Sequence, residues 1–194
     1  MAVAAECGRQ FPSWRILVLE KENLVGAHQS SHNSGVIHSG LYYRPGSLKA
    51  AACVEGAARM AAFCRQHGLP LRVCGKVVVA QSDQELPALK ELHRRGVANG
   101  VPNLSFAGPE RLREIEPHCA GVAALHLPDV AVTDYGEVTK KLAALVTAGG
   151  GAIATGAKVV GISQRESEIV VESTRGIHPR SVRCAAAGQL RRTL

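Results

Sequence analysis

A short apolar run that ends in an acidic residue constrains the fold of this chain more than any other feature. Residues 16–19 read Ile-Leu-Val-Leu, and Glu20 follows them directly. Such a run predicts a strand that is buried on both faces, as in a parallel sheet. In dinucleotide-binding folds, an acid at the end of a strand accepts hydrogen bonds from ribose hydroxyls, although an acid after a strand is also common without any such role.

Helices and further strands alternate along the rest of the chain. Ser47 is predicted to cap a helix that runs to about His67, with Gly68 just past its end. The other expected helices cover 2–11, 82–100 (from a capping box formed by Ser82 and Glu85), 109–116 and 134–148. The other expected strands cover 71–80, 121–127, 158–162 and 168–171. This mixture predicts an α/β or mixed α+β fold with two sheets.

The charge of the chain is concentrated at its end. The formal net charge is +7, but five arginines and no acid lie between Ser173 and Leu194. Without aromatic residues interleaved among the basic ones, this tail does not predict nucleic-acid binding. The six cysteines are widely spaced and form no C-x-x-C pair, so we expect reduced thiols and no zinc site.

Hydropathy bears on the compartment. Charge or glycine interrupts every long apolar run, so no membrane-spanning helix is expected. The first residues show no basic segment followed by an apolar one, so no secretory signal is expected either. We therefore predict a cytoplasmic protein and leave peripheral membrane association open.

The segment from His28 to Tyr43 concentrates polar groups around two glycine-containing steps. It holds three His, four Ser, one Gln and one Asn. Glycine lets the backbone approach a ligand closely, and hydroxyl and backbone N–H donors suit phosphate or flavin carbonyl groups. The three histidines lack a neighbouring carboxylate or thiolate to complete a metal site, so no metal is predicted.

Several segments in order resemble the L-2-hydroxyglutarate dehydrogenase/oxidase family. These enzymes are FAD-dependent members of the D-amino-acid-oxidase-like flavoprotein group. The resemblance covers about residues 14–174 and rests on the segments Leu17–Glu22, His28–Tyr43, Ser47–Ala50, Cys74–Ala80, Gly100–Pro102, Glu114–Pro117 and Val132–Tyr135.

The resemblance implies FAD as cofactor and assigns residues to it. Glu20, with Lys21 beside it, matches the acid that binds the adenosine ribose. Val159 matches a residue that touches the adenine through its backbone. The stretch that matches the segment running past the pyrophosphate toward the flavin consists of Gln29, Ser30, Ser31, His32, Asn33, Ser34, Gly35 and Val36.

The resemblance also implies the reaction. A hydride leaves C2 of L-2-hydroxyglutarate for the flavin and 2-oxoglutarate forms, with the electron acceptor unknown. His38 is the expected general base, since imidazoles exchange protons near neutral pH. Tyr43 and Arg44 are candidates to bind a carboxylate of this small 2-hydroxy dicarboxylate. Lys76 is instead assigned to a solvated strand edge.

The sequence departs from the family pattern in two places. It contains no G-x-G-x-x-G, and the resemblance fails after about Arg175. We therefore expect a chain truncated at both ends, with impaired catalysis. Residues 1–70 are expected to form a partial FAD-binding domain that lacks its first strand and Gly-rich turn. Residues 71–132 are expected to form a partial mixed-sheet substrate domain. Residues 133–175 return to the FAD-binding domain, and 176–194 form a basic divergent tail.

Other functions remain open at this point. One is a flavin oxidoreductase that acts on another 2-hydroxy acid, an amino acid or glycerol 3-phosphate. Another is a non-catalytic remnant or interaction module that uses an exposed sheet edge. A third is a protein that binds polyanions through its arginine-rich tail.

Overall fold

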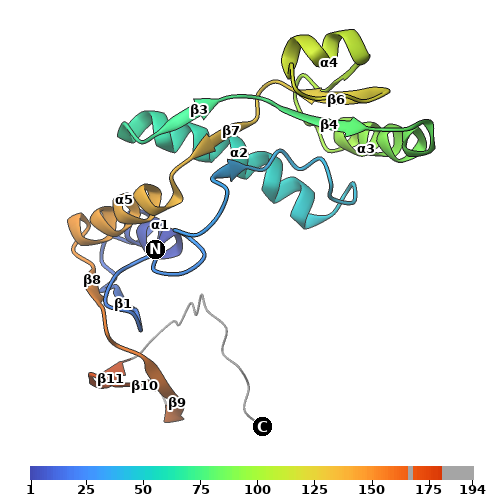
Figure 1. Ribbon diagram of the computed structural model, residues 1–194. Coiled ribbons are helices and arrows are strands. Elements are labelled where there is room, and N and C mark those ends of the chain that lie inside the picture. The colour runs from blue at the N-terminus through green and yellow to red at the C-terminus, as the bar shows by residue number, and fades with distance from the viewer. Residues whose placement is uncertain (166–167, 181–194) are drawn as a thin grey trace. The chain divides into compact units, whose positions relative to one another are not determined.

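The computed structural model describes residues 1–165 and 168–180. The chain forms two compact units, the first made of residues 1–31 and the stretch from 139 onward, and the second of residues 32–138. Both units combine helices and strands (Figure 1), which agrees with the predicted mixture. The predicted domain boundaries concern the domains of a whole flavoprotein and stay predictions.

A small parallel sheet lies in the first unit. Strand β1 (Leu17–Leu19) pairs in parallel with β8 (Ala152–Ala154), with Leu17 opposite Ala152 and Leu19 opposite Ala154. This confirms the central residues of the strand predicted from the apolar run and its parallel pairing, but the predicted burial on both faces was wrong, because Leu17 is 46% exposed. Two helices, α1 (Ala2–Gln10) and α5 (Tyr135–Ala148), precede these strands in the chain.

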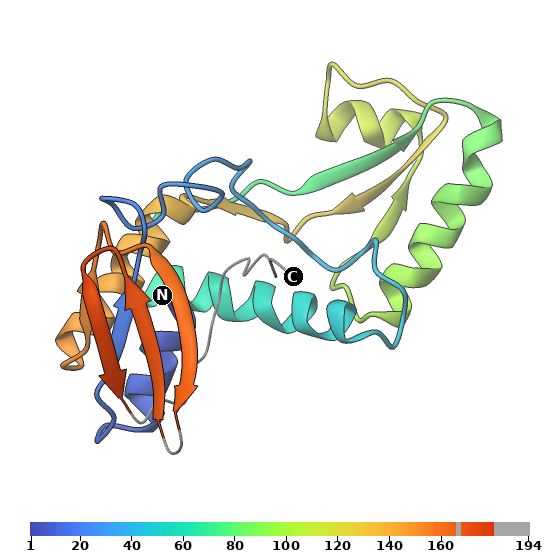
Figure 2. The same ribbon diagram turned by 90° about the horizontal axis from the view of Figure 1, so that it is seen from below.

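Three antiparallel strands follow in the same unit. Figure 2 shows them side by side, in the order β11 (Gly176–Arg180), β10 (Glu168–Ser173), β9 (Val159–Arg165). The hairpin of β9 and β10 was predicted, whereas β11 lies in the segment predicted as a divergent tail. The remainder of that tail, 181–194, lies outside the described residues.

The second unit holds a sheet between two helices. Its strands run in the order β4 (Lys76–Ala80), β6 (Ala123–Leu127), β5 (Ser105–Ala107), all antiparallel. Alternate side chains pack on opposite faces, as the strand period of two requires. Leu125 and Leu127 pack with Leu89 of α3 (Leu86–Ala98), whereas Ala124 packs with Leu112 of α4 (Pro109–Ile115).

A second sheet and a long helix complete this unit. The sheet has the order β2 (Val36–Ile37), β7 (Ala131–Thr133), β3 (Leu71–Val73). The helix α2 (Leu48–His67) begins and ends as predicted. The Ser47 side chain accepts a hydrogen bond from the Ala50 N–H, and Gly68 ends the helix with a φ of 63°.

Some local predictions were wrong. The expected strand 71–80 is two strands, because Gly75 adopts a φ of +71° between them. The expected capping box does not form: the Ser82 side chain makes no cap hydrogen bond, and Glu85 accepts from the Gln81 N–H at 2.7 Å. A 3₁₀ turn (Asp83–Glu85) stands there instead.

Three further observations concern the described residues alone. No helix among them is both long and apolar enough to cross a membrane. Five of the six cysteines are described, and all five are free thiols: Cys7, Cys53, Cys64, Cys74 and Cys119. No group of three or more His, Cys, Asp or Glu side chains within residues 1–165 and 168–180 is placed to hold a metal ion.

Candidate functional site

Residues 28–43, which we call the polar loop, contain Gly35, whose backbone forms two hydrogen bonds within the second unit. The Gly35 N–H donates to Asn33 Oδ1 at 2.8 Å, and the Gly35 carbonyl accepts from the Thr133 N–H at 2.9 Å. Gly35 has a φ of +73°, and a Cβ placed on it would lie 2.5 Å from the Thr133 carbonyl oxygen. Only glycine fits so close an approach of two backbones, which explains its place directly before β2.

Beyond β2 the chain turns through residues 38–43, and one side chain anchors this turn. Leu41 is 1% exposed and packs in the core with Leu89 and Leu125. The Nδ2 of Asn99, at the end of α3, donates to the carbonyls of Gly40 and Tyr43, both at 3.0 Å. The turn is therefore fixed by the burial of Leu41 and by the two hydrogen bonds from Asn99, which we call the Asn99 clamp.

Helix α2 holds the same turn from another side. Gly40 has a φ of +90°, and a Cβ there would lie 2.9 Å from Cγ2 of Val54. The Cys53 thiol donates to the His38 carbonyl at 3.2 Å. Burial raises the pKa of the Cys53 thiol, so this group is a weak nucleophile as well as a hydrogen-bond donor.

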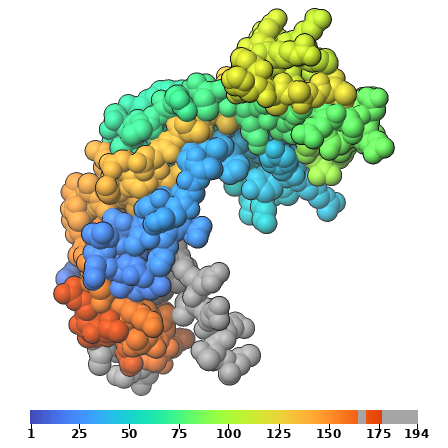
Figure 3. Space-filling model, in the orientation of Figure 1, coloured from blue at the N-terminus to red at the C-terminus, as the bar shows by residue number. Residues whose placement is uncertain are grey.

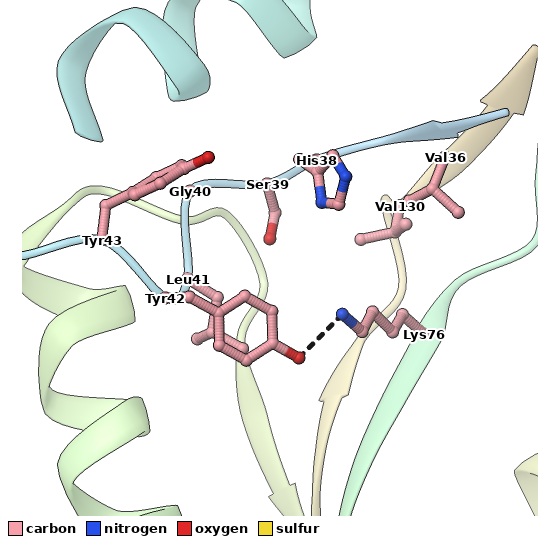
Figure 4. A pocket seen from close by; sticks show the side chains of 9 residues that line it. All are labelled: Val36, His38, Ser39, Gly40, Leu41, Tyr42, Tyr43, Lys76 and Val130. Carbon is pink, nitrogen blue, oxygen red and sulfur yellow. Dashed lines mark hydrogen bonds between the residues drawn. The ribbon is translucent and has the colours of Figure 1, made fainter. Parts of the chain in front are cut away.

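A pocket opens beside the turn (Figure 4), with a volume of about 130 Å³. The clefts that hold drug-sized ligands are larger, at roughly 300–1,000 Å³, so this pocket is small by comparison. The loop carrying it lies at the surface in the view of Figure 3. The pocket is lined by Val36, His38, Ser39, Gly40, Leu41, Tyr42, Tyr43, Lys76 and Val130.

His38, the predicted base, is therefore a pocket residue. It comes directly after β2, its side chain is exposed, and its ring makes no hydrogen bond within the described residues. An imidazole in this state can exchange a proton with a ligand in the pocket.

Lys76, which the sequence assigns to a solvated strand edge, lines the pocket. Lys76 Nζ donates to the Tyr42 hydroxyl at 2.8 Å and lies 4.5 Å from the centroid of the same ring. The sheet order puts β4 at an edge, as expected, but the Lys76 side chain is half-buried and reaches back over Tyr42. The two residues are 34 positions apart, and no local pattern relates them.

The predicted substrate-binding residues differ in their position. Tyr43 lines the pocket, and Figure 4 shows its side chain on the opposite side of the loop from Tyr42. Arg44 is exposed and is not among the pocket residues. Binding of a substrate carboxylate by either residue stays a prediction.

Glu20 stands at the end of β1 in the first unit, as predicted. It is half-buried, and its Oε1 accepts from the Glu22 N–H at 3.0 Å. Within the described residues its Oε2 has no hydrogen-bond partner. A carboxylate with one oxygen fixed and one available can accept from the hydroxyls of an adenosine ribose, and this role of Glu20 stays a prediction.

Lys21 is engaged by its neighbour. Its Nζ lies 3.3 Å from Oε1 of Glu22, and His28 Nε2 lies 2.8 Å from the same oxygen. The hydrogen bond from His28, followed by that from Lys21, lowers the pKa of the Glu22 carboxyl. This exposed cluster fixes the start of the polar loop and leaves Lys21 paired with a carboxylate.

The other predicted cofactor residues divide between the units. Gln29, Ser30, Ser31 and Val159 belong to the first unit, and residues 32–36 to the second. The Ser31 hydroxyl donates to the Gly26 carbonyl, and Val159 begins β9. Residues 29–34 are exposed, and contact of any of these residues with a cofactor stays a prediction.

Comparison with protein families decides what kind of chain this is. The model of the family described as FAD dependent oxidoreductase matches residues 1–193. The chain belongs to this family. FAD is the cofactor of the family, and an FAD-dependent oxidoreductase is what the resemblance in the sequence implied.

Curated relatives of this FAD-dependent oxidoreductase chain share one name. The L-2-hydroxyglutarate dehydrogenase of Indibacter alkaliphilus is 38% identical over 176 residues, which cover 91% of this chain and 44% of the relative. The mitochondrial L-2-hydroxyglutarate dehydrogenase of Homo sapiens is 39% identical over 184 residues, which cover 89% of this chain and 39% of the relative. The chain thus spans about two fifths of the length of such relatives.

Solved structures show the same fold at lower identity. L-α-glycerophosphate oxidase from Mycoplasma pneumoniae, reduced and with FAD bound, has a TM-score of 0.77 at 23% identity, covering 88% of this chain and 46% of that one. Glycine oxidase from Geobacillus kaustophilus has a TM-score of 0.74 at 19% identity, covering 91% and 49%. The predicted mixed α/β fold of a partial flavoprotein is therefore confirmed.

Proposed function

We propose that this chain takes part in the FAD-dependent oxidation of L-2-hydroxyglutarate to 2-oxoglutarate. The observation that carries the proposal is the pocket itself, in which the unbonded His38 imidazole and the Lys76 cation face the same small space. The relatives named L-2-hydroxyglutarate dehydrogenase support the choice of substrate. They are more similar in sequence than the oxidases of glycerophosphate and glycine, which support the fold.

The residues of this chain divide the work of the reaction. The chemistry that FAD would supply when bound is acceptance of the hydride from C2 of the hydroxy acid. His38 accepts the proton of the C2 hydroxyl, whose oxygen becomes the carbonyl oxygen of 2-oxoglutarate. Glu20 holds the ribose of the cofactor through its available carboxylate oxygen. Leu41 and Asn99 keep the His38 turn in place, so the base does not have to be ordered in each cycle.

The experiment measures 2-oxoglutarate formed by the FAD-loaded protein from the L and D enantiomers of 2-hydroxyglutarate. Product is expected from the L form. His38→Gln should lower the rate by about 10²–10⁴-fold, the usual contribution of a general base. His118→Gln is the matched control, because His118 is exposed and outside the pocket, and it should leave the rate unchanged. Equal losses in both variants would contradict the role of His38.

The compartment and the small-molecule partner of this protein are two further proposals. We propose a cytoplasmic location and a 2-hydroxy dicarboxylate as the small-molecule partner. Relatives with the same name include a mitochondrial one, so fractionation of the cells that make this protein is the test of its compartment.

A further inference from the structure

Lys76 is the charged residue of the pocket that the proposed chemistry leaves without a role. It begins β4, is half-buried, and forms no ion pair with an acidic side chain in the described part of the chain. A cation partly withdrawn from water is costly unless an anion or strong acceptors compensate it. Tyr42 supplies one acceptor and the face of its ring.

The donors of this pair are only partly used. An ammonium group carries three N–H donors, and one of those of Lys76 goes to the Tyr42 oxygen. Because that oxygen accepts, the hydroxyl hydrogen of Tyr42 remains available to another acceptor. Neither residue has a further hydrogen bond within residues 1–165 and 168–180. Figure 4 shows the two polar ends meeting at the pocket.

We propose that Lys76 and Tyr42 bind the carboxylate of the substrate that lies farther from the reacting carbon, and so select dicarboxylic hydroxy acids. The inference rests on the proposed function, since it takes its substrate from there. A carboxylate accepts from several donors at once and gains from charge-assisted hydrogen bonds, which matches what the pair offers.

The rest of the lining agrees with this arrangement. His38, in the turn after β2, and Lys76, in β4, line the same pocket from different segments, so one can meet the reacting hydroxyl while the other meets the far end of the molecule. Val36 and Val130 supply apolar surface for the methylene carbons that join the two ends. Lys76 is thus a specificity-determining residue, distinct from the base.

The test is calorimetric and needs no turnover. The purified chain is titrated with 2-oxoglutarate and with 2-oxopentanoate, which has the same five carbons and lacks the second carboxylate. We expect wild type to prefer 2-oxoglutarate by at least about tenfold, an effect of about 1.4 kcal/mol. Lys76→Met should abolish the preference, and Lys76→Arg should retain most of it. Lys90→Met, at an exposed position of α3 outside the pocket, should leave it unchanged.

Tyr42→Phe provides a second variant that keeps the ring and removes only the hydroxyl. It should weaken 2-oxoglutarate binding several-fold and leave 2-oxopentanoate binding unchanged. Equal binding of the two acids by wild type, or a preference that survives in Lys76→Met, would overturn the inference. Failure of L-2-hydroxyglutarate to give product would instead overturn the proposed function, while the binding preference could still be present.

Discussion

Two glycines with almost the same backbone conformation differ in what surrounds them. Gly35 has a φ of +73° and Gly46 a φ of +75°, but a Cβ on Gly35 would meet the Thr133 carbonyl oxygen, and one on Gly46 would meet nothing within 4 Å. Both substitutions to alanine carry the cost of a left-handed residue, about 1–2 kcal/mol. Only Gly35→Ala adds a clash between two backbones.

We therefore predict that Gly35→Ala lowers the free energy of unfolding by clearly more than Gly46→Ala. Chemical denaturation of both variants measures the difference, and the Gly46 variant serves as the matched control. An equal effect of the two substitutions would mean that the close approach of Gly35 to Thr133 is not formed in solution.

Sequence reasoning reached some residues of the site and missed others, among them Lys76. The composition of the loop and the family resemblance indicated His38, which the structure places in the pocket. Neither indicated Lys76 as a pocket residue, because its contact with Tyr42 depends on how β4 packs beside the loop. Such a contact is a product of tertiary structure and leaves no periodic signal along the chain.

At the scale of elements, the end of α3 determines the conformation of the loop. Both Nδ2 hydrogens of Asn99 are used, one on the Gly40 carbonyl and one on the Tyr43 carbonyl. We predict that Asn99→Ala destabilises the protein by about 1–3 kcal/mol, because it removes two hydrogen bonds of about 0.5–1.5 kcal/mol each, one to the part-buried Gly40 carbonyl and one to the exposed Tyr43 carbonyl. The same change should release residues 38–43 from the clamp.

Limited chymotrypsin digestion measures that release, since Tyr42 and Tyr43 are cleavage sites within the clamped turn. Cleavage there should be faster in Asn99→Ala than in wild type. Lys90→Met, on the exposed face of the same helix, should digest like wild type. Unchanged cleavage at the two tyrosines in Asn99→Ala would show that the burial of Leu41 and the contacts with α2 hold the turn without Asn99.

Helices and strands were predicted correctly where residues close in sequence determine them, and were missed where distant residues do. Both ends of helix α2 were predicted correctly, because Ser47 and Gly68 lie directly beside the helix ends that they cap. The strands β5, β7 and β8 were missed, since three residues show no period and their pairing partners lie far away in the sequence. Gly75 was read as part of a strand, although its positive φ divides β3 from β4.

At the scale of the whole molecule, the chain holds part of an FAD-dependent oxidoreductase fold, and the pocket lies within one of its two units. The family model covers residues 1–193, and the chain spans about two fifths of its named relatives. All nine pocket residues lie in the second unit, within residues 32–138. Binding of the proposed substrate acid by the pocket residues can therefore be tested with substitutions within this unit.

The central claim is that L-2-hydroxyglutarate is the reductant of the flavin. The most direct measurement is the visible absorbance of the FAD-loaded protein, mixed without oxygen with L-2-hydroxyglutarate, D-2-hydroxyglutarate, glycerol 3-phosphate or glycine. The account predicts that the L enantiomer bleaches the flavin bands and that the other three leave them unchanged. Bleaching by glycerol 3-phosphate or glycine, with no response to L-2-hydroxyglutarate, would contradict it.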